Sequence, residues 1–89
     1  GNVGINNPLP FENHILVFPN PTKDIVEVIC DTEEMNAIEI FDIAGRIVYA
    51  DHNPLQETSI SVSNLPPAVY VIKVSFNKGN SQYSKFIKQ

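Results

Sequence analysis

The sequence predicts an all-β fold, a seven-stranded antiparallel β-sandwich, from three observations. Apolar and polar residues alternate with a period of two in several short runs, as half-buried strands require. Clusters of Gly, Pro, Asn and Asp separate these runs, mostly at intervals of about eight to twelve residues, and no run has a helical period. With 89 residues the chain amounts to one domain, whose core must come from two packed layers because one sheet cannot cover its own apolar face.

The first expected strand runs from His14 to Phe18 and ends at Pro19-Asn20-Pro21-Thr22. Two prolines fix two φ angles and remove two backbone donors, so this segment is predicted to be a stiff corner. The second strand, Ile25 to Cys30, has Val26, Val28 and Cys30 on one face. Asp31 to Asn36 is expected to form an acidic loop.

The central stretch, Ile38 to Tyr49, predicts a hairpin that turns through Asp42 to Gly45. A type I turn followed by a residue at positive φ favours Asp or Asn first and Gly last. Asp42 is expected to accept a hydrogen bond from the amide two residues on, and Gly45 to adopt the left-handed conformation. Ile38 and Ile40 should share one face, and Ile47 and Tyr49 another.

Three further strands are expected in the second half of the chain. Ser59 to Ser63 sends Ile60 and Val62 inward, and Asn64 to Ala68 then forms a corner with Leu65 at the end of the core. Val69 to Phe76 is the longest strand, with Tyr70, Ile72, Val74 and Phe76 on one face. Asn77 to Asn80 is a second hairpin turn, which leads into a last strand from Ser81 to Gln89.

Tyr70 favours an immunoglobulin-like version of the sandwich. It lies near the start of the sixth strand, where such folds often hold a tyrosine whose hydroxyl bonds back to the preceding corner. An ordinary half-buried tyrosine is the alternative. The Cys and Trp pair of antibody domains is absent from the sequence.

The charge is unevenly distributed. The net charge of −4 argues against nucleic acid as a partner, because phosphates need a basic surface. All ten acids precede Thr58, and the segment after it carries Lys73, Lys78, Lys85 and Lys88 without an acid. The last two strands are therefore expected to form a basic edge. Its lysines either discourage aggregation between sheets or contact an acidic partner.

Candidate catalytic and metal sites are weak. Cys30 is the single cysteine and its position favours a small buried filler. His14 and His52 lack ligand spacing for zinc, and neither a nucleophile motif nor a phosphate loop is present. A calcium ion on Asp31, Glu33 and Glu34, or on Asp51 with Asn53, is less favoured than a solvated acidic loop. We expect a non-catalytic chain without cofactors.

Four segments carry a resemblance to a known family. Phe18-Pro-Asn-Pro-Thr22 with Asp24, Ile40-Phe-Asp-Ile-Ala-Gly-Arg46, Leu65-Pro-Pro-Ala-Val-Tyr70 and Lys85-Phe-Ile-Lys88 occur in this order. Together they resemble the C-terminal sorting domain of cargo exported by the type IX (Por) secretion system. The similarity covers Val17 to Gln89, and it departs from the family at Ala68, where Gly is usual.

The resemblance implies a cleavable sorting signal. Residues 1–14 would be a linker to a missing upstream passenger, and residues 15–89 the sorting domain. A translocon would recognise the folded domain in the periplasm and at the outer membrane, and a sortase-like peptidase would then cut within or upstream of residues 1–16, leaving the passenger at the cell surface or secreted. The residues expected to serve recognition are Pro19, Asn20, Pro21, Asp24, Gly45, Arg46, Tyr70, Lys85, Phe86, Ile87 and Lys88.

One physical hypothesis and two alternatives accompany this interpretation. The final strand, with Lys85 and Lys88 flanking Phe86, is predicted to dock through strand addition or into an acidic groove. A weak homodimer through an edge strand is a further expectation. The competing functions are a fibronectin-like or carbohydrate-binding module, disfavoured because the sequence has no Trp and three Tyr, and a structural spacer.

Overall fold

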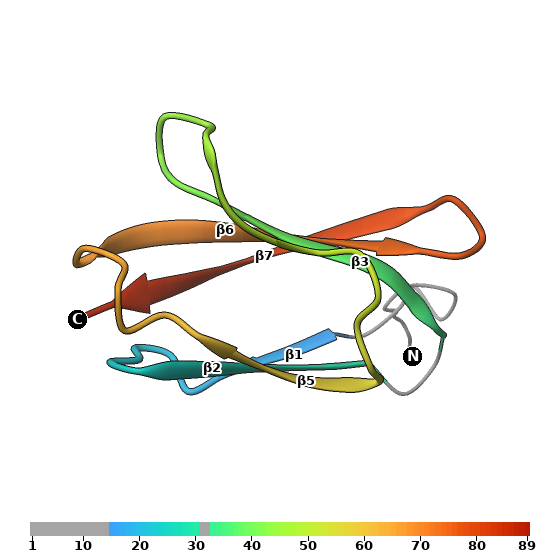
Figure 1. Ribbon diagram of the computed structural model, residues 1–89, viewed down its shortest axis with the longest axis horizontal. Helices are drawn as coiled ribbons and strands as arrows, with labels where there is room; N and C mark the ends of the chain where they lie inside the picture. Colours follow the sequence, from blue (N-terminus) through green and yellow to red (C-terminus); the bar gives the residue numbers. More distant parts are fainter. Residues whose placement is uncertain (1–14, 31–32) are drawn as a thin grey trace, which may run out of the picture.

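The computed structural model describes residues 15–30 and 33–89, and it confirms the all-β prediction (Figure 1). Some predictions concern residues outside this described part of the chain. They are the linker, a peptidase cut at any position up to residue 14, and the roles of His14 and Asp31. The seven strands are β1 (Ile15–Phe18), β2 (Ile25–Cys30), β3 (Met35–Phe41), β4 (Ile47–Asp51), β5 (Glu57–Ser61), β6 (Ala68–Phe76) and β7 (Ser81–Lys88). The described residues contain no helix that is long and apolar enough to cross a membrane.

The strands form two antiparallel sheets that face each other (Figure 1). One sheet has the order β1-β2-β5 and the other the order β4-β3-β6-β7. This topology corrects the prediction of a basic edge built from the last two strands. β6 lies inside its sheet, between β3 and β7, so of the last two strands only β7 lies at a sheet edge. The lysines of the C-terminal third are therefore spread over the sheet and its hairpin.

The core lies between the two sheets and consists of the alternating residues that the sequence predicts. The inward side chains come from both layers and are almost completely buried: Val26, Val28, Cys30, Ile38, Ile40, Ile60, Val62, Ile72, Val74, Phe76 and Phe86. Leu65 is partly buried and packs against this cluster, as expected for the corner before β6. Burial of these side chains removes apolar surface from water, the dominant favourable term in folding.

Several strand boundaries differ from the prediction: β5 ends at Ser61 instead of Ser63, β6 begins at Ala68 instead of Val69, β7 ends at Lys88 instead of Gln89, and three further differences are larger in consequence. β3 begins at Met35, so the acidic loop is shorter than expected. Met35 is buried and pairs with Phe76, but its polar neighbours in the sequence hide the alternation that would have predicted this. β5 begins at Glu57, because backbone pairing with Ile29 continues the ladder although the side chain is exposed. β4 extends to Asp51, which pairs with Ile38.

The face assignment in β4 is also corrected. A register shift between Ile40 and Phe41 leaves Tyr49 opposite Ile40 and Ile47 opposite Phe41. Tyr49 packs against the core, whereas the side chain of Ile47 is exposed. The two residues therefore do not share a face, because an irregularity of one residue reverses the alternation beyond it.

Candidate functional site

The four segments that carry the family resemblance lie far apart in the sequence but gather at one end of the sandwich. We call this end, formed by residues 18–24, 40–46, 65–70 and 85–89, the motif end. Lys88 of β7 pairs with Ala68 of β6 and forms a parallel bridge with Thr22. Phe41, just before the central turn, pairs with Val71 of β6. The C terminus marks the same end in Figure 1.

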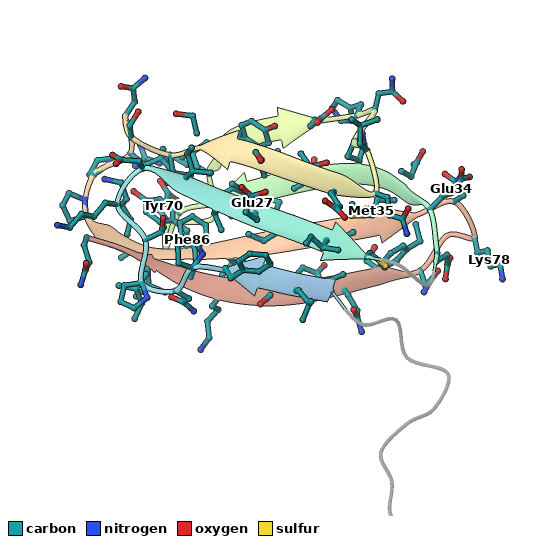
Figure 2. The ribbon with its side chains drawn as sticks, turned by 90° about the horizontal axis from the view of Figure 1, so that it is seen from below. Glu27, Glu34, Met35, Tyr70, Lys78 and Phe86 are labelled. Carbon is teal, nitrogen blue, oxygen red and sulfur yellow. The ribbon has the colours of Figure 1, made fainter. Side chains whose placement is uncertain are left out.

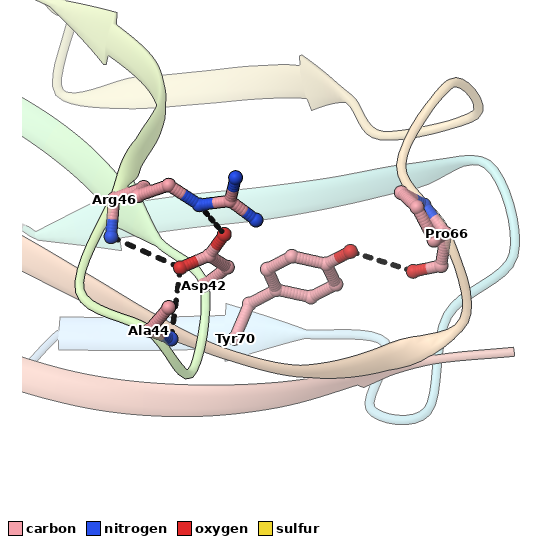
Figure 3. Close-up of polar contacts among 5 residues, drawn as sticks. All are labelled: Asp42, Ala44, Arg46, Pro66 and Tyr70. Atoms are coloured by element: carbon pink, nitrogen blue, oxygen red, sulfur yellow. Dashed lines mark hydrogen bonds and ion pairs between the residues drawn. The ribbon is translucent and has the colours of Figure 1, made fainter.

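The central turn is held by the side chain of Asp42. The Gly45 N–H donates to the Asp42 carbonyl oxygen at 3.0 Å, and the Asp42 N–H donates to the Arg46 carbonyl oxygen at 3.0 Å. Asp42 Oδ1 accepts from the backbone N–H groups of Ala44 and Arg46, each at 2.9 Å (Figure 3). Gly45 has a φ of 84°, so both predictions for this turn are confirmed.

Asp42 also fixes the side chain of Arg46. The Arg46 Nε donates to Asp42 Oδ2 at 2.9 Å, while the Arg46 side chain stays 80% exposed and that of Asp42 only 15%. The hydrogen bond from the Arg46 backbone N–H lowers the pKa of Asp42, against an opposing effect of burial, and the Arg46 side chain and the Ala44 N–H lower it further. Asp42 is thus an ionised anchor beneath an exposed guanidinium.

Tyr70 joins the corner before β6 to the interior. Its hydroxyl donates to the Pro66 carbonyl oxygen at 2.6 Å (Figure 3), which confirms the predicted tyrosine corner. The ring is buried and stacks on Phe86, with centroids 5.4 Å apart and an interplanar angle of 22°. Figure 2 shows the two rings together, at the end of the sandwich opposite Glu34 and Lys78.

A shallow hollow of about 290 Å³ separates the hairpin tip from this corner. Its lining residues are Asp42, Ile43, Ala44, Arg46, Val48, Pro66, Ala68 and Tyr70. Sequence reasoning identified Arg46 and Tyr70 but missed Ile43, Val48 and Pro66. Ile43 and Pro66 lie within the motif segments and Val48 lies outside them, but no sequence pattern indicated that the two distant turns would bring the three residues to one hollow.

The corner at Pro19 to Thr22 is clamped onto the outer edge of β7. The Asn20 side-chain amide donates through Nδ2 to the Lys85 carbonyl oxygen at 3.3 Å and accepts at Oδ1 from the Ile87 N–H at 2.9 Å. The Thr22 N–H donates to the Ile87 carbonyl oxygen at 2.9 Å, and the Gln89 N–H donates to the Thr22 carbonyl oxygen at 2.8 Å. Both Phe18–Pro19 and Asn20–Pro21 peptide bonds are cis.

This clamp changes the prediction that β7 docks through strand addition. Strand addition needs unpaired backbone groups along a sheet edge. Between Lys85 and Gln89 the outward groups are already bonded to Asn20 and Thr22. This stretch of β7 therefore has no open ladder for an added strand.

The predicted recognition residues divide by burial. Phe86 is fully buried, and Lys88 is 8% exposed with its Nζ donating to the Gln89 carbonyl oxygen at 3.2 Å. The expectation that both present themselves to a partner is therefore wrong, since β7 alternates and these two residues share its inward face. Lys85 and Ile87 lie on the outward face and are exposed. Asp24 is exposed, and its carbonyl oxygen accepts from the Val62 N–H at 2.8 Å.

A second hollow, of about 520 Å³, lies at the opposite end of the sandwich. It is lined by Glu33, Glu34, Met35, Asn36, His52, Asn53, Pro54, Leu55, Gln56 and Asn77. Among residues 15–30 and 33–89, no three His, Cys, Asp or Glu side chains come close enough to hold a metal ion. Asp51 Oδ1 accepts from the Asn53 N–H at 2.9 Å, as in an ordinary turn.

Two solved structures share this architecture. PorZ, a bacterial surface component of the type IX secretion system of Porphyromonas gingivalis, is 20% identical with a TM-score of 0.72; the match covers 84% of this chain and 11% of PorZ. A DUF3244 family protein from Bacteroides vulgatus with an immunoglobulin-like β-sandwich fold is 22% identical with a TM-score of 0.71, covering 88% of this chain and 92% of that protein. These similarities show the fold, which is the predicted immunoglobulin-like sandwich.

The family follows from the sequence itself. No curated protein matches the chain significantly. The family model described as the secretion system C-terminal sorting domain matches residues 16–89 and thereby includes all four segments of the motif end. The chain therefore belongs to the family of C-terminal sorting domains of type IX secretion.

Proposed function

We propose that this domain is a non-catalytic export signal, which directs an attached passenger through the type IX secretion system and is recognised by its folded surface. The observation that carries the proposal is the gathering of four distant motif segments at one end of the sandwich. A core needs no such clustering of motifs. A recognition surface that is attached to unrelated passengers does need this clustering, because the translocon must recognise the domain independently of the passenger that precedes it.

The predicted recognition residues act in two ways in this proposal. Arg46, Lys85 and Ile87 are exposed and contact the partner. Tyr70, Phe86 and Lys88 are buried and hold the surface in shape. The exposed residues Pro19, Asn20, Pro21, Asp24 and Gly45 lie in the turns that border the contact surface.

The docking face of β7 is its outward side-chain row and not its backbone edge. Tyr83, Lys85 and Ile87 lie on this outward side, where Ile87 is 47% exposed. A lysine between two apolar side chains suits a partner groove that is acidic and apolar. The homodimer through an edge strand stays a prediction, and β4 is the better candidate because its Ile47 and Val48 are exposed at a sheet edge.

The proposed function implies a route of export for the passenger and the attached domain. The passenger and the domain pass through the periplasm, the domain docks at the outer-membrane translocon, and a sortase-like peptidase cuts ahead of β1. The passenger is then at the cell surface or secreted. A cut ahead of β1 suits a peptidase, because backbone within a packed sheet is hidden.

The test is export of a reporter protein fused ahead of the 89-residue chain in a host with a working type IX system. The wild-type fusion should reach the cell surface. Lys85→Gln combined with Ile87→Ser should reduce export about tenfold, the effect of roughly 1.4 kcal/mol of lost binding. Both side chains are exposed, so thermal unfolding of the variant should match that of the wild type.

The matched control is Lys78→Gln, which removes an exposed lysine from the opposite end of the sandwich (Figure 2). It should leave export unchanged. A wild-type fusion that stays inside a competent host contradicts the proposal. Full export of the double variant contradicts the assignment of docking to β7.

A further inference from the structure

We propose that the hollow between the hairpin tip and the β5–β6 corner binds a partner segment in which a carboxylate stands beside an apolar side chain. This inference rests on the proposed function and deepens it, because it names the chemistry that the motif end recognises. The hollow combines an oriented guanidinium with an exposed apolar wall, and each half selects one part of such a segment.

The carboxylate half of the site is Arg46. Its Nε is bonded to Asp42, which fixes the plane of the guanidinium. Its two terminal amino groups have no partner among the residues that the structure describes, and the side chain is 80% exposed. Two parallel N–H donors in a fixed plane match the two oxygens of a carboxylate.

Asp42 does not compete with an incoming carboxylate. Its Oδ1 accepts from two backbone N–H groups and its Oδ2 from the Arg46 Nε, so its own turn uses both oxygens. Figure 3 shows the Arg46 Nε bonded to Asp42 and the two terminal nitrogens at the far end of the side chain. Asp42 is also the only acidic residue lining the hollow in the described part of the chain.

The apolar half consists of Ile43 and Val48 opposite Pro66 and Ala68. Ile43 is 84% exposed at the tip of the hairpin, and Val48 is 37% exposed. Neither packs into the core, so their apolar surface is available to a partner. The volume of about 290 Å³ is near the lower limit for ligand pockets and suits one or two side chains.

The chemistry of the lining favours a peptide over a sugar or a nucleic acid. A sugar needs an aromatic face for stacking, but the Tyr70 ring is 3% exposed and its hydroxyl is bonded to Pro66. Nucleic acid needs a basic surface, and the chain carries a net charge of −4. An acidic and apolar peptide segment uses both halves of the hollow.

The test is an NMR titration of the 15N-labelled 89-residue chain with three short peptides. Acetyl-Ala-Asp-Leu-Ala-amide should shift the amide signals of Ile43, Ala44 and Arg46 in a saturable manner, with a Kd of about 1 mM. Acetyl-Ala-Asn-Leu-Ala-amide, which lacks the charge, should bind about tenfold more weakly. Acetyl-Ala-Asp-Ala-Ala-amide, which lacks the apolar side chain, should also bind more weakly.

Variants of exposed side chains separate binding from folding. Arg46→Gln and Ile43→Ser should each weaken binding of the Asp-Leu peptide severalfold, and Arg46→Lys should restore only part of the loss because lysine lacks the planar fork. Lys78→Gln removes the same charge from the opposite end and should bind as the wild type does. Shifts at the opposite hollow, or equal affinity for the Asp and Asn peptides, would overturn the inference.

Failure of this inference is distinguishable from failure of the proposed function. If the reporter is exported but the Asp-Leu peptide shows no saturable shifts, the hollow is not the binding site and the export function stands. If the peptide binds but the reporter stays inside a competent host, the site stands and the export function fails. If both hold, Arg46→Gln should also reduce export.

Discussion

The two hairpin turns of the four-stranded sheet share one geometry but are stabilised differently. In both, a glycine at positive φ donates from its N–H to the carbonyl oxygen of the first turn residue: Gly45 to Asp42 at 3.0 Å, and Gly79 to Phe76 at 2.9 Å. In both, the first residue donates to the residue after the glycine. The difference lies in what the first residue does with its side chain.

At the motif end, the first residue is Asp42, whose carboxylate accepts hydrogen bonds from its own turn and from Arg46. At the opposite end it is Phe76, whose side chain is buried in the core, and the loop is tied down by Asn77 Nδ2 donating to Glu34 Oε1 at 3.0 Å. A turn held by its own polar group keeps its shape without burial. Its apolar and cationic side chains therefore stay available at the surface.

The largest expected effect comes from the turn that is held by packing. Phe76→Ala should lower the free energy of unfolding by about 3 to 5 kcal/mol, because it removes a buried aromatic ring and leaves a cavity. Urea unfolding of the variant and the wild type measures the change. A loss below about 1.5 kcal/mol, the cost of a conservative swap, would show that the core does not anchor this turn.

Substitution of the two glycines should show what the turns have in common. Gly45→Val and Gly79→Val should each cost about 1 to 2 kcal/mol, because a β-branched residue is strained at positive φ. A Cβ at either glycine would meet no atom within 4 Å, so the cost is conformational and should be similar at both ends. Thermal unfolding of the two variants makes the comparison. Unchanged stability at Gly45 would contradict its turn assignment.

The clamp on β7 offers a smaller and more local effect. Asn20→Ala should cost about 1 kcal/mol and should speed hydrogen exchange at the Ile87 amide, which loses its acceptor. Hydrogen exchange followed by NMR measures this directly. Asn77→Ala, which removes a comparable surface bond at the opposite end, is the control and should leave Ile87 protected. Equal protection in both variants would mean that Asn20 does not hold the strand.

The smallest effect concerns the charge of Asp42. Its pKa is held below the ordinary value of 3.8, so the ionised form stabilises the fold fully above about pH 4, and this contribution is lost as the pH falls through the folded pKa. Asp42→Asn should therefore have a lower Tm than the wild type at pH 7, and the difference should shrink on acidification. Melting curves between pH 7 and pH 2.5 test this. A constant difference would show that charge plays no part in the turn.

Sequence reasoning predicted the features that depend on neighbouring residues. Alternation identified every strand, and it identified the buried faces of β2, β5 and β6, but not the face of Ile47 in β4, where a register shift intervenes, nor the inward face of β7. Asp42, Gly45 and Tyr70 were predicted with their interactions, because each bonds within four residues along the chain. Hydrogen bonds between residues close in the sequence can be predicted from the spacing of residue types alone.

The features that the sequence did not predict depend on contacts between segments that are distant along the chain. Asn20 bonds to β7 across 65 and 67 residues, and nothing near Asn20 in the sequence indicates that partner. The position of β6 inside its sheet likewise depends on pairing with β3. Lys88 was expected to be exposed because lysine usually is, but the alternation of β7 places its side chain inward, beside Thr22.

The direction of β1 has a steric consequence. β1 begins at Ile15, opposite Cys30, and runs toward Phe18 and the motif end, so the chain enters the strand from the side that faces away from the C terminus (Figure 1). A globular partner joined ahead of Ile15 would be attached at the start of β1, which points away from the clamped corner that follows Phe18. In the proposed export function, the direction of β1 therefore favours attachment of a cargo away from the motif end.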